Sequence, residues 1–201
     1  MDASTTLGDN FITAFYTVFD LLQLPVPSSF PASSQPPLAS SAILIYGAGS
    51  TTGQYAIQLL HSAGYKNIIA TASPKNHDYL RSLGATSTFD YRSPDLVRDI
   101  AVAAGGDGKV TLALDCIATL ADSLATIAKV ISPRGLVAIL LPIKMGTTLT
   151  IDGGSEMLMD LPKDKNPLPE GTTVILVRGF NYQTNVRQFL CPGVPLLIAL
   201  S

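Results

Sequence analysis

The sequence is short of charge, of histidine and cysteine, and of long apolar runs. Charged residues make up 14% of the 201 residues and the formal net charge is −2, so the chain lacks the clustered basic residues that nucleic-acid binding requires. Only two cysteines are present, Cys116 and Cys191. They form neither a disulfide framework nor a zinc cluster of the CxxC type, and we expect two reduced thiols.

Targeting signals are also missing from the sequence. The first residues, MDASTTLGDN, carry acid where a signal peptide carries basic residues, and the longest apolar runs are too short to cross a membrane. We therefore expect a cytoplasmic protein without membrane contact.

Apolar residues, in contrast, are abundant. They make up 47% of the sequence and the mean hydropathy is +0.33, which is high for a domain surrounded by water. This excess predicts an apolar surface that a second copy or a partner protein covers, or a chain that is part of a larger protein.

Apolar strands alternate with amphipathic helices between residues 42 and 178. Strands are predicted at 42–46, 67–72, 87–91, 110–115, 136–141 and 173–178, with helices at 51–63, 76–83, 94–104 and 120–131. Ser93 is the expected N-cap of the third of these helices, with Pro94 at its first position. Strands that are apolar throughout and separated by helices imply a parallel sheet covered on both faces. The sequence thus predicts a doubly wound α/β fold.

Two appendages flank this alternation. Residues 10–24 carry apolar side chains at helical spacing, and residues 25–41 are rich in proline and serine, which favours a linker. We therefore predict a helix and linker at 1–41, an α/β domain at 42–181 and an irregular tail at 182–201.

Three glycines, Gly47, Gly49 and Gly53, lie between the first predicted strand and the first predicted helix in the stretch ILIYGAGSTTGQYAIQLL. Glycine there permits a tight turn, a backbone that touches a diphosphate and close packing of helix on strand. The spacing is one residue longer than the usual dinucleotide fingerprint, and glycine also serves turns of purely structural role. The strand before and the helix after nevertheless favour a phosphate site, and three hydroxyls follow: Ser50, Thr51 and Thr52.

The second predicted strand indicates which dinucleotide is bound. An NAD site normally places Asp or Glu there to bind the ribose 2′-hydroxyl, but the sequence reads TASPKN. Ser73 offers a hydroxyl and Lys75 an ammonium group, which suit a 2′-phosphate. Tyr91, after the third strand, can stack or donate nearby, although a solvated lysine and a core tyrosine are the alternative interpretations. We predict NADPH as the cofactor.

Four segments carry a resemblance to a known family: GAGSTTGQYAIQLL, IIATASPKNHDYLRSLGAT, FDYRSPDL and LALDCIAT. They resemble the medium-chain dehydrogenase/reductase superfamily, above all the zinc-independent fungal enoyl reductases that act in trans with polyketide synthases, and the related quinone reductases. The resemblance covers residues 10–142 well and is loose from there to 181. It implies a Rossmann nucleotide-binding domain and NADPH-dependent hydride transfer to an activated C=C bond of an enoyl thioester or quinone-like substrate.

The resemblance also implies roles for individual residues. The pyrophosphate ligands would be Ser50, Thr51 and Thr52, and the 2′-phosphate ligands Ser73, Lys75 and Tyr91. The adenosine or ribose side would be lined by Cys116 and Ile117, and the nicotinamide would be approached by Leu141 and Pro142. Cys116 is equally well interpreted as a small buried residue at a strand end.

The sequence departs from the family in what it lacks. The N-terminal GroES-like domain, which closes the cleft over the cofactor in the family, has no counterpart, and no Cys/His/Glu set can build a catalytic zinc site. His61 and His77 are therefore expected at the surface or rim, and no catalytic acid is identified. Two alternatives stay open: a non-catalytic NADPH-binding subunit or sensor, and an isomerase or cyclase that retains the fold.

Overall fold

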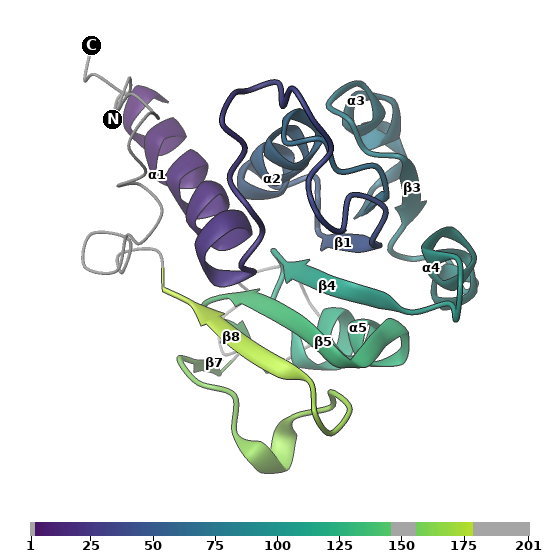
Figure 1. Cartoon of the computed structure of the whole chain (residues 1–201). Helices are drawn as coiled ribbons and strands as arrows, with labels where there is room; N and C mark the ends of the chain where they lie inside the picture. The colour runs from purple at the N-terminus through teal and green to yellow at the C-terminus, as the bar shows by residue number, and fades with distance from the viewer. Residues whose placement is uncertain (1–2, 146–155, 179–201) are drawn as a thin grey trace.

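In the computed structural model, which describes residues 3–145 and 156–178, six strands form one parallel sheet (Figure 1). Its order is β3-β2-β1-β4-β5-β8, and every neighbouring pair is parallel. The strands are β1 (Ile43–Tyr46), β2 (Ile68–Ala72), β3 (Ser87–Asp90), β4 (Val110–Asp115), β5 (Ile131–Leu140) and β8 (Thr173–Val177). The predicted doubly wound fold is confirmed.

Helices cover both faces of the sheet because its central strand is apolar on both sides. On β1, Ile43 belongs to the core cluster that includes α2, whereas the next residue, Leu44, belongs to the cluster that includes α4 and α5. Both side chains are fully buried. The helices are α2 (Thr51–Ser62), α3 (His77–Ser82), α4 (Leu96–Ala104) and α5 (Ala125–Val130).

Several element boundaries differ from those predicted. The expected helix start at Pro94 is wrong, because the Leu96 amide bonds the Ser93 carbonyl at 3.2 Å and closes a turn before α4 begins. The Ser93 hydroxyl accepts instead from the amide of Asp95, at 3.2 Å. Strand β5 begins before its predicted start at residue 136, since Ile131 already pairs with Val110 and a register shift follows.

The N-terminal helix α1 (Ala3–Phe15) begins before the expected start at Asn10. It continues into a π-helical segment, η1 (Tyr16–Leu21). It runs beside α2 (Figure 1), and the fully buried Val18 and Phe19 belong to the same core cluster as β1 and α2. The Phe11 ring meets the Tyr55 ring edge-on, with centroids 5.5 Å apart. The segment expected as an appendage therefore packs as part of the α/β core.

A small antiparallel ribbon of β6 (Ile143–Lys144) and β7 (Met157–Leu158) follows β5 and was not predicted. The expected tail at 182–201, with Cys191, lies outside the described residues. Among the helices that are described, none has the length and hydropathy to cross a membrane.

Candidate functional site

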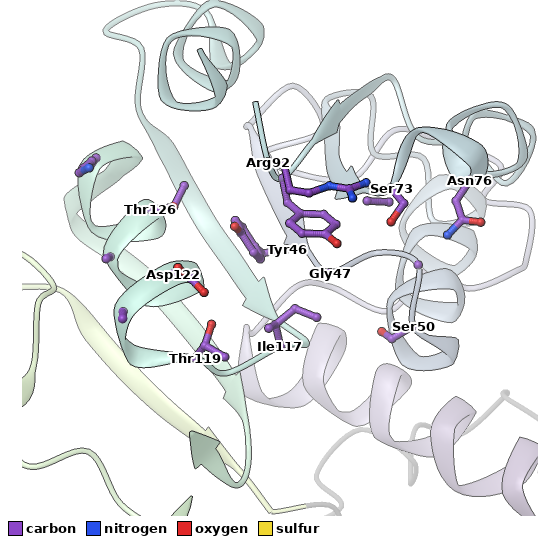
Figure 2. A pocket seen from close by; sticks show the side chains of 16 residues that line it. Tyr46, Gly47, Ser50, Ser73, Asn76, Arg92, Ile117, Thr119, Asp122 and Thr126 are labelled. Carbon is purple, nitrogen blue, oxygen red and sulfur yellow. The ribbon is translucent and has the colours of Figure 1, made fainter. Parts of the chain in front are cut away.

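A cavity of about 620 Å³ opens at the carboxyl ends of β1, β2, β3 and β4 (Figure 2). In doubly wound sheets ligands bind at this edge, where the crossover helices switch from one face of the sheet to the other. Here β1 and β4 are the neighbours at that switch. Six of the residues predicted from the sequence line the cavity: Gly47, Gly49, Ser50, Ser73, Tyr91 and Ile117.

The glycine turn has the geometry that its sequence predicts. Gly47 has φ +77°, and its amide donates to the Thr71 hydroxyl at 3.1 Å. A Cβ on Gly47 would lie 2.4 Å from Cγ1 of Ile117, and one on Gly53 would lie 2.8 Å from Cα of Ala48. Gly47 thus permits the wall of the cavity to close on the turn, and Gly53 permits α2 to pack tightly on the turn.

The start of α2 offers amides to an anion. Ser50 is the N-cap: its hydroxyl accepts from the Gly53 amide at 3.2 Å, and its carbonyl accepts from the Gln54 amide at 2.9 Å. Helix geometry leaves the amides of Thr51 and Thr52 without a partner inside the helix, and the helix dipole favours an anion beside them. This end of α2 suits a diphosphate through its backbone.

The side chains of Thr51 and Thr52 do not face the cavity, unlike the start of the helix that carries them. Thr51 is exposed, whereas the buried Thr52 donates its hydroxyl to Oδ1 of Asn10 at 2.7 Å. Neither side chain is part of the cavity wall. The hydroxyl of Thr52 is thus committed to α1, and the contribution of both residues to phosphate binding remains a prediction that rests on their amides.

A cation that the sequence analysis missed stands at the end of β3. Arg92 lines the cavity beside Tyr91, with its guanidinium carbon 5.0 Å from the centroid of that ring, and points toward Ser73 (Figure 2). Its Nε lies 3.3 Å from Oδ1 of Asp90, and hydrogen bonds from Arg92 hold the pKa of that carboxyl below its ordinary value. Lys75, in contrast, is exposed and outside the lining. The signal for Arg92 was available, since it follows Tyr91 directly.

The wall of the cavity across from Arg92 was also not predicted from the sequence. It comes from the loop after β4 and from η3 (Leu120–Leu124) and α5, with polar side chains of Thr119, Asp122 and Thr126 facing the cavity (Figure 2). Burial raises the pKa of Tyr46 to about 12, against a hydrogen bond with Thr126 that lowers it, so the phenol is neutral at physiological pH. The spacing of these residues is visible in the sequence, but their direction depends on where the helix lies.

Three further predicted residues lie outside the cavity lining: Cys116, Leu141 and Pro142. Leu141 and Pro142 directly follow β5 and are partly buried. The Cys116 amide donates to the Tyr46 carbonyl at 2.9 Å. Burial raises the pKa of its thiol to about 12, an effect that the Ser50 hydroxyl partly opposes.

We expect Cys116 to resist alkylation in the folded protein. A thiol pKa of about 12 in place of the ordinary 9.0 lowers the thiolate fraction at pH 8 by roughly 1000-fold. After iodoacetamide treatment, peptide mass spectrometry of the tryptic fragment 110–129 should find Cys116 unmodified in native protein and modified in urea. Rapid native labelling would contradict the raised pKa of this partly buried thiol.

Comparisons with known proteins show what the chain is similar to. The family model described as "Zinc-binding dehydrogenase" matches residues 51–153. The dual trans-enoyl reductase/FAD-dependent monooxygenase tazHJ of Aspergillus terreus is 37% identical over 69% of this chain and 19% of its own length. The trans-enoyl reductase iccB of Talaromyces variabilis is 41% identical over 61% of this chain and 32% of its own length.

Among solved structures, the CurK enoyl reductase superposes with a TM-score of 0.59 at 22% identity, covering 88% of this chain and 44% of that one. This structural similarity supports the α/β fold. The curated relatives confirm the resemblance to fungal enoyl reductases that the sequence indicates. Matched segments of this chain span about a third or less of the two curated relatives.

Proposed function

Because the chain belongs to the zinc-binding dehydrogenase family, we propose that it forms the nicotinamide-dinucleotide-binding part of a reductase that acts on carbon–carbon double bonds. The observation that carries this proposal is the cavity at the carboxyl edge of the sheet, closed on one side by the Gly47 turn and the start of α2. The reaction class comes from the relatives, which are named trans-enoyl reductases. The substrate in this proposal is the one that the sequence resemblance implies, an enoyl thioester or a quinone-like compound.

The cofactor we propose is NADPH. The end of β2 carries no carboxylate to receive a ribose 2′-hydroxyl, and it places Ser73 in the cavity opposite Arg92 (Figure 2). A hydroxyl and a guanidinium suit a 2′-phosphate, because a guanidinium donates two parallel hydrogen bonds to phosphate oxygens. The guanidinium lies over the Tyr91 ring, with its carbon 5.0 Å from the ring centroid. Arg92 takes the role for which the sequence favoured Lys75.

Bound NADPH would supply the hydride, and this chain's residues would bind and orient it. The amides at the start of α2 would hold the diphosphate, and Ile117 would pack against the dinucleotide from the β4 side. Gly49 leaves room for the Asn76 side chain, since a Cβ there would lie 2.9 Å from Nδ2 of Asn76. The residues that bind the substrate and protonate the product are not assigned.

The family description names zinc, but the described residues do not fit a zinc site. They contain no group of three or more His, Cys, Asp or Glu side chains that could hold a metal ion. His61 is exposed, and His77 places Nε2 3.1 Å from the Ala72 carbonyl oxygen. No step of the proposed function passes through a metal, and zinc independence is part of the proposal.

Titration with reduced dinucleotides tests the proposal. We expect NADPH to bind at least about 10-fold more tightly than NADH, a difference of roughly 1.4 kcal/mol, measured by nicotinamide fluorescence. Adding a short enoyl thioester or a quinone should then consume the absorbance of the reduced nicotinamide. NADPH binding without turnover would favour the non-catalytic subunit, and equal affinity for the two dinucleotides would contradict the 2′-phosphate assignment.

A further inference from the structure

Asp115, the last residue of β4, is a carboxylate that is fully buried. Such groups occur inside proteins only with hydrogen-bonding partners. Oδ1 accepts from the amides of Ile117 and Ala118, both at 2.9 Å, and Oδ2 accepts from the hydroxyl of Ser123 at 2.6 Å. Every one of these neighbours donates, so the geometry matches a carboxylate that only accepts.

The charge state of Asp115 is set by opposing effects. Burial is the largest effect and raises its pKa above the ordinary value, while the hydrogen bonds from Ser123, Ala118 and Ile117 and the charge of Lys144 partly oppose this rise. A proton on Oδ2 would reverse the direction of the hydrogen bond with Ser123, whereas Oδ1 would still accept from the amides of Ile117 and Ala118.

The loop after β4 depends on these hydrogen bonds. Ala118 has φ +55°, a left-handed conformation that a non-glycine residue keeps only where its surroundings hold it. The Ser123 hydroxyl, itself bound to Asp115, accepts from the Thr119 amide at 2.9 Å. The Lys144 amide donates to the Ala118 carbonyl at 2.7 Å and ties the same loop to β6.

This loop forms one wall of the cavity. Ile117 and Thr119 both line it (Figure 2), and the Ile117 side chain sits over the bare Cα of Gly47, where a Cβ would be 2.4 Å away. Without an acceptor at Asp115, the amides of Ile117 and Ala118 would need other partners, and the loop could leave its left-handed turn. Ile117 would then lose its fixed position over the glycine turn.

We propose that Asp115 is a positioning residue for the cofactor: it fixes the loop of Ile117 and Thr119 against Gly47 and so sets dinucleotide affinity without contacting the ligand. This inference rests on the proposed function, because it assigns the wall to dinucleotide binding. It predicts that affinity depends on the hydrogen bond between Asp115 and Ser123, which is buried and lies outside the cavity lining.

Two conservative variants test it in the full chain. Asp115→Asn keeps the shape and one oxygen for the two amides but places an NH2 group opposite Ser123, and Ser123→Ala removes the partner from the other side. We expect each to weaken NADPH binding about 5-fold. Since both break the same bond, the double variant should be little weaker than the worse single one. The backbone amide resonances of Ile117 and Ala118 should shift in Asp115→Asn.

A matched control separates positioning from general stability. Thr86→Ala removes a hydroxyl that accepts from the Ile68 amide at the opposite end of β2, so it should lower the melting temperature and leave NADPH affinity unchanged. Asp115→Asn and Ser123→Ala variants that melt earlier but bind NADPH like the wild type would overturn the Asp115 proposal alone. A wild-type chain that binds no NADPH would overturn the proposed function, and this inference with it.

Discussion

Replacement of Gly47 by alanine is expected to weaken NADPH binding at least about 100-fold, roughly 2.7 kcal/mol, and to destabilise the fold by about 2–4 kcal/mol. Gly47 has φ +77°, and its added Cβ would lie 2.4 and 2.6 Å from Cγ1 and Cδ1 of Ile117. Ile117 would have to move into the space that the dinucleotide needs. Fluorescence titration and chemical denaturation measure the two losses separately.

Gly105→Ala is the matched control for this substitution. Gly105 has φ +68° but nothing within 4 Å of its Cβ position, and it follows α4, away from the cavity lining. It should therefore show only the conformational cost of an alanine at φ +68° and ψ −170°, a region that glycine alone adopts readily, about 1–3 kcal/mol, with NADPH affinity unchanged. If Gly47→Ala lost no more affinity than Gly105→Ala, the contact between Ile117 and the turn would not matter for binding.

Reversing the charge of Arg92 should remove most of the preference for NADPH. In Arg92→Glu a carboxylate would face the 2′-phosphate, so NADPH affinity should fall about 30-fold while NADH affinity changes less than about 3-fold. The side chain is 61% exposed, and solvent screening keeps the expected loss below that of a buried ion pair. Parallel titrations with the two dinucleotides give both numbers.

Two other charge reversals control for this experiment. Arg98→Glu makes the same change on α4, where Arg98 pairs with Asp95 and Asp99 and does not line the cavity, and it should leave both affinities unaltered. Lys75→Glu tests the residue that the sequence favoured. A larger loss of NADPH affinity in Lys75→Glu than in Arg92→Glu would show that Lys75, and not Arg92, binds the 2′-phosphate.

The sequence predicted the sheet and the glycine turn because both depend on local patterns. A strand buried on both faces is apolar at every position, as β1 is, and Gly47 lies where a strand gives way to a helix in a turn that only glycine adopts without strain. Both signals lie within about 20 residues of sequence, so no knowledge of the tertiary arrangement was needed to interpret them.

The remaining features depend on contacts between distant segments. Thr126 enters the cavity wall only because α5 packs beside the end of β1, and the direction of a helical residue is not fixed by spacing alone. Arg92 and Lys75 are both cations that follow strands, and the sequence had no means to decide which one faces Ser73. The early start of β5 at Ile131 likewise follows from its pairing with Val110.

The bond from Thr52 to Asn10 also bears on how this protein can be shortened. Trimming at residue 42, where the sequence places the first strand, would delete α1, strip Phe11 from the Tyr55 ring and leave the Thr52 hydroxyl to find another acceptor beside the diphosphate site. The smallest fragment that preserves the start of α2, where we propose that the diphosphate binds, therefore includes the N-terminal helix.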